Sequence, residues 1–309
     1  MSTDQPIPDA GPVRMSYFGG PGSFTSTAAH QYAERTFGGG QFVLYEEIAG
    51  VAASHGDVCR HVQLREADYG VLPIENNLEG VVAETLDALR ASDLRIYGEI
   101  TIPIIHHLLS RTEDVDAIRA IYSHPQAIRQ CRRWLDRFRA AHPGGEIGAE
   151  ASTAVAARRA GGEDGSAAIG TEEAAELHGL KVIARDVGDS PLNVTRFWVV
   201  GRNFADPTGF DKTTLLVELQ NRPGTLRNLL DIFAARKLNM LTIHQRPLEY
   251  NAELERMEYY WFLDYEGHIN EPSLYTAFNE LVSHRPRVCR EAKVLGSYPQ
   301  STIPGGGRW

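Results

Sequence analysis

Cysteine is scarce in this 309-residue chain, which has three, at positions 59, 131 and 289. They lie far apart in sequence, so no C-x-x-C pair exists, which argues against a zinc site and against a redox dithiol. A sparse, odd number of cysteines is typical of proteins of the reducing cytoplasm, and we therefore expect a cytoplasmic location.

Long apolar runs are also missing. No stretch approaches the roughly 18 consecutive apolar residues of a membrane-spanning helix, so the sequence predicts no membrane partner. Residues 1–14 are polar, contain prolines and lack the apolar centre of a signal peptide. We expect these residues to form a disordered leader.

Basic residues are outnumbered: 31 lysines and arginines stand against 40 aspartates and glutamates, giving a net charge of −9. A nucleic-acid interface would need a clustered basic face. Arginines do gather between residues 129 and 139, but they share that segment with Asp136, in the pattern of a solvated helix face. The sequence therefore predicts no nucleic-acid partner.

The usual signatures of cofactor sites are absent as well. A glycine-rich turn at residues 19–22 lies between a predicted strand (15–18) and a predicted helix (27–35), but its spacing is not G-x-G-x-x-G, which argues against a dinucleotide. His106 and His107 lie in an apolar stretch without a carboxylate or cysteine at metal-ligand spacing, so we expect structural histidines and no metal. The turn does offer backbone N–H groups to a carboxylate or phosphate of a small ligand.

What the chain does contain is a strand, a polar loop and a helix that recur between residues 15 and 202. Open α/β sheets place ligand groups at the carboxyl ends of strands. Residues 95–109 lead to a second lobe, and strands at 180–184 and 197–200 lead back. We therefore predict a two-lobed α/β domain with a ligand cleft between its lobes. Polar residues follow predicted strands at 74–77, 123–126 and 170–173.

Residues 193–197, Asn-Val-Thr-Arg-Phe, begin a strand that continues into an apolar run. Neighbours on a strand point to opposite faces of the sheet. We therefore predict that Thr195 and Arg196 serve different surfaces, one lining the cleft and the other bracing the backbone behind it.

The sequence pattern changes after residues 203–211, which contain Pro207 and Gly209 and predict a linker. Period-two strands then alternate with helices that carry an apolar stripe. The order is βαββαβ, the ferredoxin-like plan, over residues 212–298. Residues 299–309 are predicted to form a loose tail. The predicted strands are 214–219, 240–247, 258–265 and 294–298, and the predicted helices are 226–233 and 274–282.

Several segments match one known family in order. They are residues 17–24 (Tyr-Phe-Gly-Gly-Pro-Gly-Ser-Phe), 73–77 (Pro-Ile-Glu-Asn-Asn), 123–126 (Ser-His-Pro-Gln) followed by Gln130 and Cys131, and 193–197 (Asn-Val-Thr-Arg-Phe). On these segments the chain resembles prephenate dehydratase with a C-terminal ACT regulatory domain, over residues 15–298. The resemblance implies a periplasmic-binding-protein-like catalytic domain at 15–202 and an ACT domain at 212–298.

The activity that the resemblance implies is the conversion of prephenate to phenylpyruvate in phenylalanine biosynthesis, with loss of water and carbon dioxide. This is a carbon–oxygen lyase reaction, for which the resemblance implies neither a metal nor an organic cofactor. Thr195 would donate a hydrogen bond to the departing hydroxyl, in an electrostatic and orienting role. Glu75, Asn76 and Gln130 are the other implied catalytic residues.

Substrate binding is assigned by the same resemblance. The two carboxylates of prephenate would be held by neutral donors and helix N-termini, at Gly22 with Ser23 and at Ser152 with Thr153. For Arg196 we favour a role in bracing the cleft wall over direct contact with the substrate. The implied substrate-binding residues are Gly22, Ser23, Phe24, Asn77, Ser123, Ser152, Thr153, Thr171, Asn193, Arg196 and Phe197.

Some positions depart from the family pattern, and they leave alternatives open. Asn77 replaces a serine, Ser23 a threonine, and Gly170 with Thr171 an Ala-Ser pair. One alternative is a relative that decarboxylates prephenate without aromatising it, and another is an arogenate dehydratase. A different class of protein, a non-catalytic small-ligand sensor, is disfavoured because Thr195 is retained.

The C-terminal domain implies regulation and assembly. In the family, phenylalanine binds through a Glu-Ser-Arg-Pro segment and a Gly-Ala-Leu segment; here these are residues 244–247 (His-Gln-Arg-Pro) and 224–226 (Gly-Thr-Leu). Histidine in place of glutamate removes an acceptor for an amino group, so phenylalanine is a candidate effector only. Pairing of ACT domains implies a homodimer or homotetramer. The implied allosteric residues are Gly224, Thr225, Leu226, His244, Gln245, Arg246 and Pro247.

Overall fold

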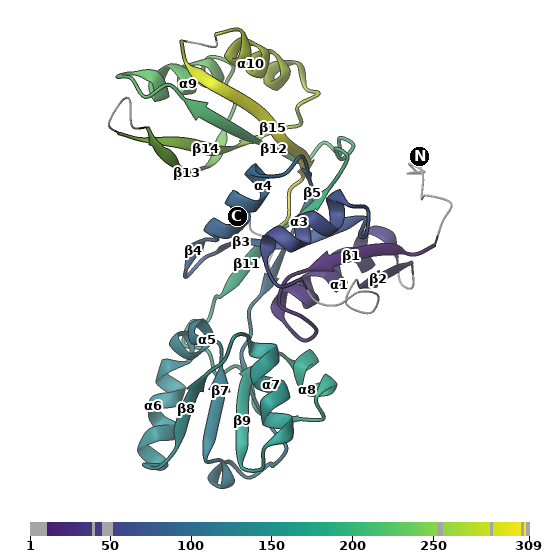
Figure 1. Cartoon of the computed structure of the whole chain (residues 1–309), viewed down its shortest axis with the longest axis vertical. Coiled ribbons are helices and arrows are strands. Elements are labelled where there is room, and N and C mark those ends of the chain that lie inside the picture. Colours follow the sequence, from purple (N-terminus) through teal and green to yellow (C-terminus); the bar gives the residue numbers. More distant parts are fainter. Residues whose placement is uncertain are drawn as a thin grey trace.

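The computed structural model has three α/β bodies in a row, with a first lobe between a second lobe and a C-terminal domain (Figure 1). Strand β1 (Val13–Tyr17) begins the first lobe, so the predicted leader does not extend to residue 14, because Val13 and Arg14 pair with Phe42 and Val43. Residues 1–10 of that leader lie outside the described residues. The structure describes residues 11–38, 41–44, 52–251, 256–284, 287–303 and 306.

The described part of the first lobe is a mixed sheet with helices on both faces. Its strand order is β2-β1-β3-β11-β5, with β4 paired to β3. Helix α1 packs on one face, against Met15, Val71 and Phe197, while α3 and α4 pack on the other. The remaining strands are β2 (Phe42–Leu44), β3 (Tyr69–Asn76), β4 (Gly80–Val81), β5 (Arg95–Pro103) and β11 (Val194–Gly201), and the helices are α1 (Phe24–Phe37), α3 (His55–Gln63) and α4 (Ala83–Arg90).

The second lobe has the strand order β10-β6-β9-β7-β8. Residues 104–106 and 185–193 connect it to the first lobe, which confirms the two-lobed prediction. Within residues 95–109, strand structure ends at Pro103 and begins again at His107. Between them, the Ile104 N–H bonds to the Asn193 carbonyl of the other connection. The elements are β6 (His107–Ser110), η1 (Val115–Ala117), β7 (Ala120–Ser123), α5 (Pro125–Gln130), α6 (Arg132–Ala141), β8 (Glu146–Ala149), α7 (Thr153–Gly162), β9 (Ser166–Gly170), α8 (Glu172–Leu177) and β10 (Lys181–Ala184).

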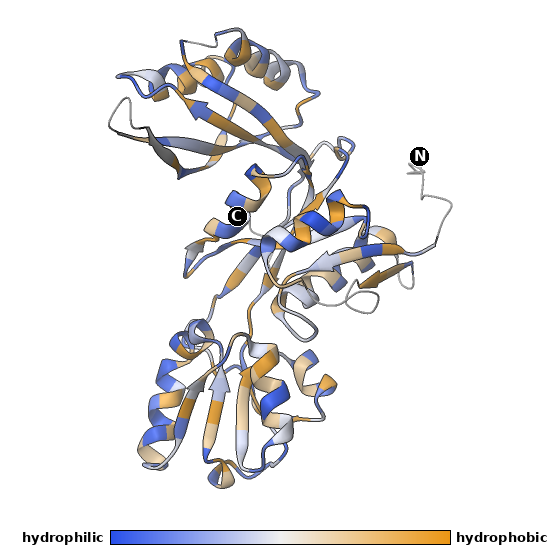
Figure 2. Cartoon of the chain, in the orientation of Figure 1, coloured by the Kyte–Doolittle hydropathy of each residue, from blue (hydrophilic) through white to orange (hydrophobic). Residues whose placement is uncertain are grey.

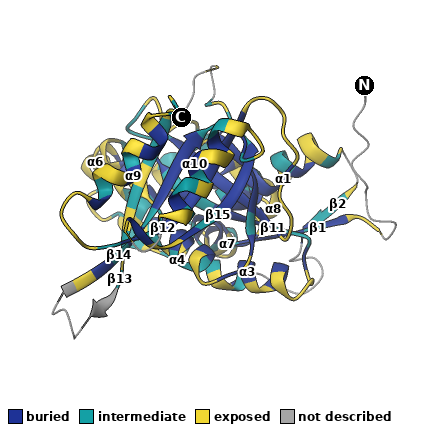
Figure 3. Cartoon of the chain, turned by 90° about the horizontal axis from the view of Figure 1, so that it is seen from above, coloured by how far each residue is buried: buried dark blue, intermediate teal, exposed yellow. Residues whose placement is uncertain are grey.

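The C-terminal domain has the predicted βαββαβ order, with the sheet order β13-β14-β12-β15. Viewed from above, the strands β12 and β15 are largely buried and the helices expose their outer faces (Figure 3). Asp211 already belongs to β12, and Ser301 bonds to Glu99, so the predicted linker and tail are both shorter than expected. The elements are β12 (Asp211–Leu219), α9 (Thr225–Ala234), β13 (Met240–Asn251), β14 (Arg256–Glu266), α10 (Pro272–Ser283) and β15 (Cys289–Pro299).

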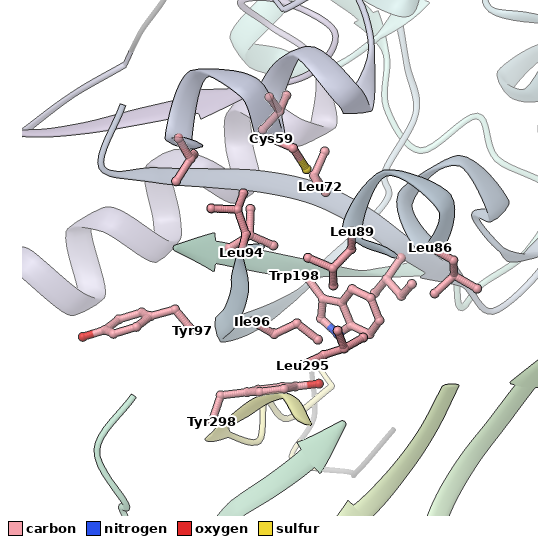
Figure 4. Packing of buried hydrophobic residues seen from close by; sticks show 14 of the residues in the cluster. Cys59, Leu72, Leu86, Leu89, Leu94, Ile96, Tyr97, Trp198, Leu295 and Tyr298 are labelled. Atoms are coloured by element: carbon pink, nitrogen blue, oxygen red, sulfur yellow. The ribbon is translucent and has the colours of Figure 1, made fainter. Parts of the chain in front are cut away.

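Hydrophobic residues follow the strands and the inward faces of the helices throughout (Figure 2). One buried cluster is shared by the first lobe and the C-terminal domain: Ile96 and Trp198 meet Leu295 and Tyr298 of β15 (Figure 4). A Cβ on Gly296 would lie 2.2 Å from the Ile96 carbonyl oxygen. The two domains are therefore joined by close backbone packing as well as by side chains.

We predict that Gly296→Ala lowers the free energy of unfolding by about 1–3 kcal/mol, because the added methyl group meets backbone that cannot move aside. Urea denaturation measures this change. Gly144→Ala is the matched control, since nothing lies within 4 Å of its added Cβ. Equal denaturation midpoints for the two variants would show that the close contact with Ile96 is not formed.

Candidate active site

A β-bulge arranges the side chains where β3 meets β11. Thr195 pairs with Asn76 and Arg196 with Glu75, but Phe197 pairs with Pro73, so Ile74 is an extra residue on β3. Bulges re-aim side chains beside functional sites. Here the bulge places Pro73 and Asn76 on one face of the sheet, although they are three residues apart, and leaves Glu75 on the other.

A cleft of about 670 Å³ lies between the two lobes, and Thr195 and Asn76 line it. Phe24 and Phe197 supply aromatic walls, and Gln130 enters from the second lobe. None of the described lining residues is a lysine or an arginine. The lining residues are Phe18, Gly19, Ser23, Phe24, Thr25, Ala53, Ser54, His55, Gly56, Pro73, Asn76, Val82, Glu84, Ile104, His106, His124, Gln126, Ala127, Gln130, Ala151, Ser152, Thr153, Thr195 and Phe197.

The Asn76 amide fixes the direction of the Thr195 hydroxyl. Asn76 Oδ1 accepts the backbone N–H groups of Leu78 and Glu79 at 2.9 and 3.1 Å, which identifies the other amide atom as nitrogen. Asn76 Nδ2 donates to Asn193 Oδ1 at 2.8 Å and to Thr195 Oγ1 at 2.9 Å. Since Thr195 Oγ1 accepts this bond, its own proton remains available for donation.

The hydrogen-bond chain continues into the second lobe through Gln130. Gln130 Oε1 accepts from Asn193 Nδ2 and from His106 Nε2, each at 2.9 Å. Burial lowers the pKa of His106, although its hydrogen bond to Gln130 opposes that shift. His106 is therefore a neutral imidazole that donates through Nε2. The sequence predicts a structural histidine at this position because no other ligand lies at metal-binding spacing. Its partner Gln130 is 24 residues away and reaches it only in the fold.

Three helices with a serine at the N-cap present their N-termini to the cleft. Their N-cap residues Ser23, Ser54 and Ser152 all line it and accept backbone N–H groups, at 3.2, 3.1 and 3.0 Å. Helix N-termini attract anions through free N–H groups and the helix dipole. The sequence predicted the sites at Ser23 and Ser152 but not the one at Ser54. A capping-box pattern, Ser54 with Asp57 three residues later, could have revealed it.

Three histidines, His55, His106 and His124, line the same cleft. In each case burial is the largest influence and lowers the pKa, which favours the neutral imidazole. His55 is also held by a contact of 3.2 Å between its Nδ1 and Thr85 Oγ1. The cleft thus offers an anion neutral hydrogen-bond donors and helix ends.

Six of the predicted substrate-binding residues are not among the residues that line this cleft: Gly22, Asn77, Ser123, Thr171, Asn193 and Arg196. Ser123 Oγ donates to the Ile169 carbonyl at 2.7 Å inside the second lobe. Asn77 instead binds the chain where β11 begins, accepting from Val194 N and donating to the Leu192 carbonyl. Thr171 and Gly22 meet each other across the lobes, with Thr171 Oγ1 donating to the Gly22 carbonyl at 2.8 Å. The predicted residues that do line the cleft are Ser23, Phe24, Asn76, Gln130, Ser152, Thr153, Thr195 and Phe197, with Asn193 bonded behind them.

Arg196 and Glu75 lie on the opposite face of the sheet, toward the C-terminal domain. Arg196 is 1% exposed and forms ion pairs with Glu75 at 2.9 Å and with Asp264 at 3.3 Å. The prediction that Thr195 and Arg196 serve different surfaces is therefore confirmed. The position of Arg196 agrees with the bracing role that the sequence favoured over substrate contact, whereas the Glu75 side chain, expected to be catalytic, points away from the cleft.

The residues expected to form the effector site are distributed over the C-terminal domain. Gly224 is the N-cap of helix α9, with a φ of 83°, and Thr225 is the first residue of that helix. On β13, Arg246 forms an ion pair with Asp87 of α4. His244 Nε2 lies 4.0 Å from Glu75 Oε2. Part of the segment 244–247 therefore faces the first lobe.

No group of three or more histidine, cysteine, aspartate or glutamate side chains in the described ranges is placed to hold a metal ion. No helix in the same ranges is long and apolar enough to cross a membrane.

Comparison with known proteins identifies the family. Residues 15–205 match the family model described as prephenate dehydratase. A bifunctional chorismate mutase/prephenate dehydratase of Stutzerimonas stutzeri is 36% identical over 94% of this chain and 74% of its own length. A prephenate dehydratase of Amycolatopsis methanolica is 35% identical over 93% and 89%. The structure of Arthrobacter aurescens prephenate dehydratase in complex with L-Phe has a TM-score of 0.79 and 32% identity, and covers 93% of this chain and 90% of that one. The chain, with its two-lobed cleft and the strand that carries Thr195, belongs to the prephenate dehydratase family.

Proposed function

We propose that this protein converts prephenate to phenylpyruvate, carbon dioxide and water, as a carbon–oxygen lyase. The observation that carries the proposal is the hydroxyl of Thr195, which accepts from Asn76 Nδ2 at 2.9 Å and keeps its own proton for the cleft. Membership of the family supports the same reaction. Like its relatives, the chain would act within phenylalanine biosynthesis.

The reaction breaks two bonds of prephenate. The electron pair of the bond between the ring and its carboxylate enters the ring as carbon dioxide departs. The carbon–oxygen bond to the ring hydroxyl breaks at the opposite position, and the oxygen leaves with its electron pair. Aromatisation drives both changes. Thr195 donates a hydrogen bond to the departing oxygen and stabilises the charge that develops on it, while solvent completes the protonation to water.

The charge-poor lining suits a carboxylate that must leave as a neutral molecule. An arginine or lysine paired with that carboxylate would stabilise the substrate more than the transition state, in which its charge has moved toward the hydroxyl. The N-termini of α1, α3 and α7 can hold the dianion through neutral N–H groups. Phe24 and Phe197 would pack against the ring. The cleft therefore orients prephenate without opposing its decarboxylation.

For the C-terminal domain we propose phenylalanine as the effector and a homodimer or homotetramer as the assembly. Arthrobacter aurescens prephenate dehydratase, with the same fold, has been solved in complex with L-Phe. The βαββαβ sheet of this chain supports the assignment of an ACT domain. His244 and Gln245 stand where the family has glutamate and serine, so any response to phenylalanine rests on the remaining residues, Arg246 and Pro247 among them.

We predict that Thr195→Ala lowers kcat for prephenate by about 10²- to 10³-fold with little change in KM, because it removes a donor that acts on the departing oxygen. Thr195→Ser, which keeps a hydroxyl, is the control and should retain most of the activity. Absorbance and product mass after incubation with prephenate measure the result. Wild-type rates for the alanine variant would exclude Thr195 as the donor. A decarboxylated product that keeps its hydroxyl would identify the wild-type protein as a non-aromatising enzyme.

Asn76→Asp should also lower kcat by about 10²-fold, with a small change in KM. The new carboxylate has the shape of the amide but cannot donate to Thr195 Oγ1, so the Thr195 proton turns toward that carboxylate and away from the substrate. Asn203→Asp is the matched control, since Asn203 is exposed and outside the cleft lining. Equal losses in steady-state kcat for the two variants would contradict the assigned direction of the hydroxyl.

A further inference from the structure

Behind the cleft, a cluster of charged side chains joins the first lobe to the C-terminal domain. Its core is Arg196, which pairs with Glu75, Glu99 and Asp264 at 2.9, 3.4 and 3.3 Å. Lys212 of β12 adds an ion pair with Glu99 at 2.7 Å. Of these described members, three are carboxylates and two are permanent cations. Ion pairs in such a buried position are strongly coupled to the packing around them.

The Asp264 carboxylate of this cluster is held in its charged form. Burial acts to raise the pKa of Asp264, but the charges of Lys212 and Arg196 and the hydroxyls of Thr214 and Thr242 outweigh it, and the pKa is lowered. Thr214 Oγ1 donates to Asp264 Oδ1 at 2.6 Å. The cluster is therefore a site where a further positive charge is favourable.

His244 of β13 is the titratable neighbour that can supply this charge. Its Nε2 lies 4.0 Å from Glu75 Oε2, is buried and has no hydrogen-bond partner among the described residues. Its register partner on β14 is the apolar Phe262, and the nearby pair of Arg246 with Asp87 is already matched. The charged groups toward which His244 faces are Glu75 and, beyond it, Arg196.

Glu75 and Arg196 are direct chain neighbours of the cleft residues. Glu75 precedes Asn76, and Arg196 follows Thr195, on paired strands. The side chains of Asn76 and Thr195 point into the cleft, and those of their chain neighbours point to the other face of the sheet. A shift of Glu75 or Arg196 therefore moves the backbone that carries the hydrogen bond between Asn76 and Thr195. An interaction at Glu75 is therefore transmitted to the donor in the cleft over one residue of backbone.

We propose that His244 is a positioning residue, whose protonated imidazole pairs with Glu75 and holds the C-terminal domain against the strands that carry Asn76 and Thr195. The inference rests on the proposed function for its catalytic readout. Histidine normally changes its charge between pH 5 and 8. Turnover in the cleft then depends on the protonation of a residue in the other domain.

The test compares His244→Gln, which is always neutral, with His244→Arg, which is always charged. As the pH rises from 6 to 8, the wild-type kcat for prephenate should fall by about threefold more than the kcat of either variant. A change of this size is expected for the loss of a partly exposed ion pair. His244→Arg should be fast and His244→Gln slow across this range, with KM little changed. His284→Gln, an exposed histidine of the same domain, is the control and should keep the wild-type profile. Identical pH profiles for all four proteins would overturn the proposal.

A second readout separates this inference from the proposed function. The urea midpoint of the wild-type protein should rise relative to that of His244→Gln as the pH is lowered from 8 to 6, because the ion pair exists only when His244 is protonated. If prephenate is not turned over at all, the proposed function fails, and this midpoint difference alone decides whether His244 pairs with Glu75. A midpoint difference that does not change with pH would overturn the pairing.

Discussion

Strand β11 returns from the second lobe and pairs with β3 in a register that contains one bulge, and both functional faces of the molecule depend on this pairing. It sets Thr195 beside Asn76 in the cleft, and Arg196 beside Glu75 against the C-terminal domain. Without the bulge, period two would place Pro73 and Glu75 on one face and Asn76 on the other. Asn76 would then be unable to orient the Thr195 hydroxyl from the same side as the cleft wall formed by Pro73.

The two faces of this sheet differ in the charged groups that they carry. On the domain side, permanent charges are buried and paired, since an unpaired buried Arg196 would be strongly destabilising. On the cleft side, the described lining has no lysine or arginine, its histidines favour the neutral form, and helix N-termini provide the positive potential. A substrate that must lose a carboxylate as carbon dioxide is oriented best by such neutral donors. The paired charges behind the sheet keep the strands in place without competing for it.

The hydrogen-bond chain from Thr195 through Asn76, Asn193 and Gln130 to His106 crosses from one lobe to the other. Gly22 and Thr171 add a second contact between the lobes. The geometry of the donor therefore depends on how the lobes meet. The C-terminal domain acts on the same strands from behind, through Asp264 and the shared apolar cluster around Trp198. The position of the Thr195 hydroxyl therefore depends on the packing of the lobes and of the C-terminal domain.

The sequence by itself determined the two-lobed α/β fold, the βαββαβ domain, and eight residues that line the cleft, because periodicity, caps and ordered motifs are local properties of the chain. It also predicted that Thr195 and Arg196 face opposite ways, since strand alternation is local. Only the tertiary structure decided that Glu75 leaves the cleft, because the bulge depends on the register between β3 and β11. Only the tertiary structure placed His106 beside Gln130 and His244 beside Glu75. The two residues of each pair belong to different elements, which meet only when the chain folds. Contacts of this kind carry no local pattern, and their distances are set by packing.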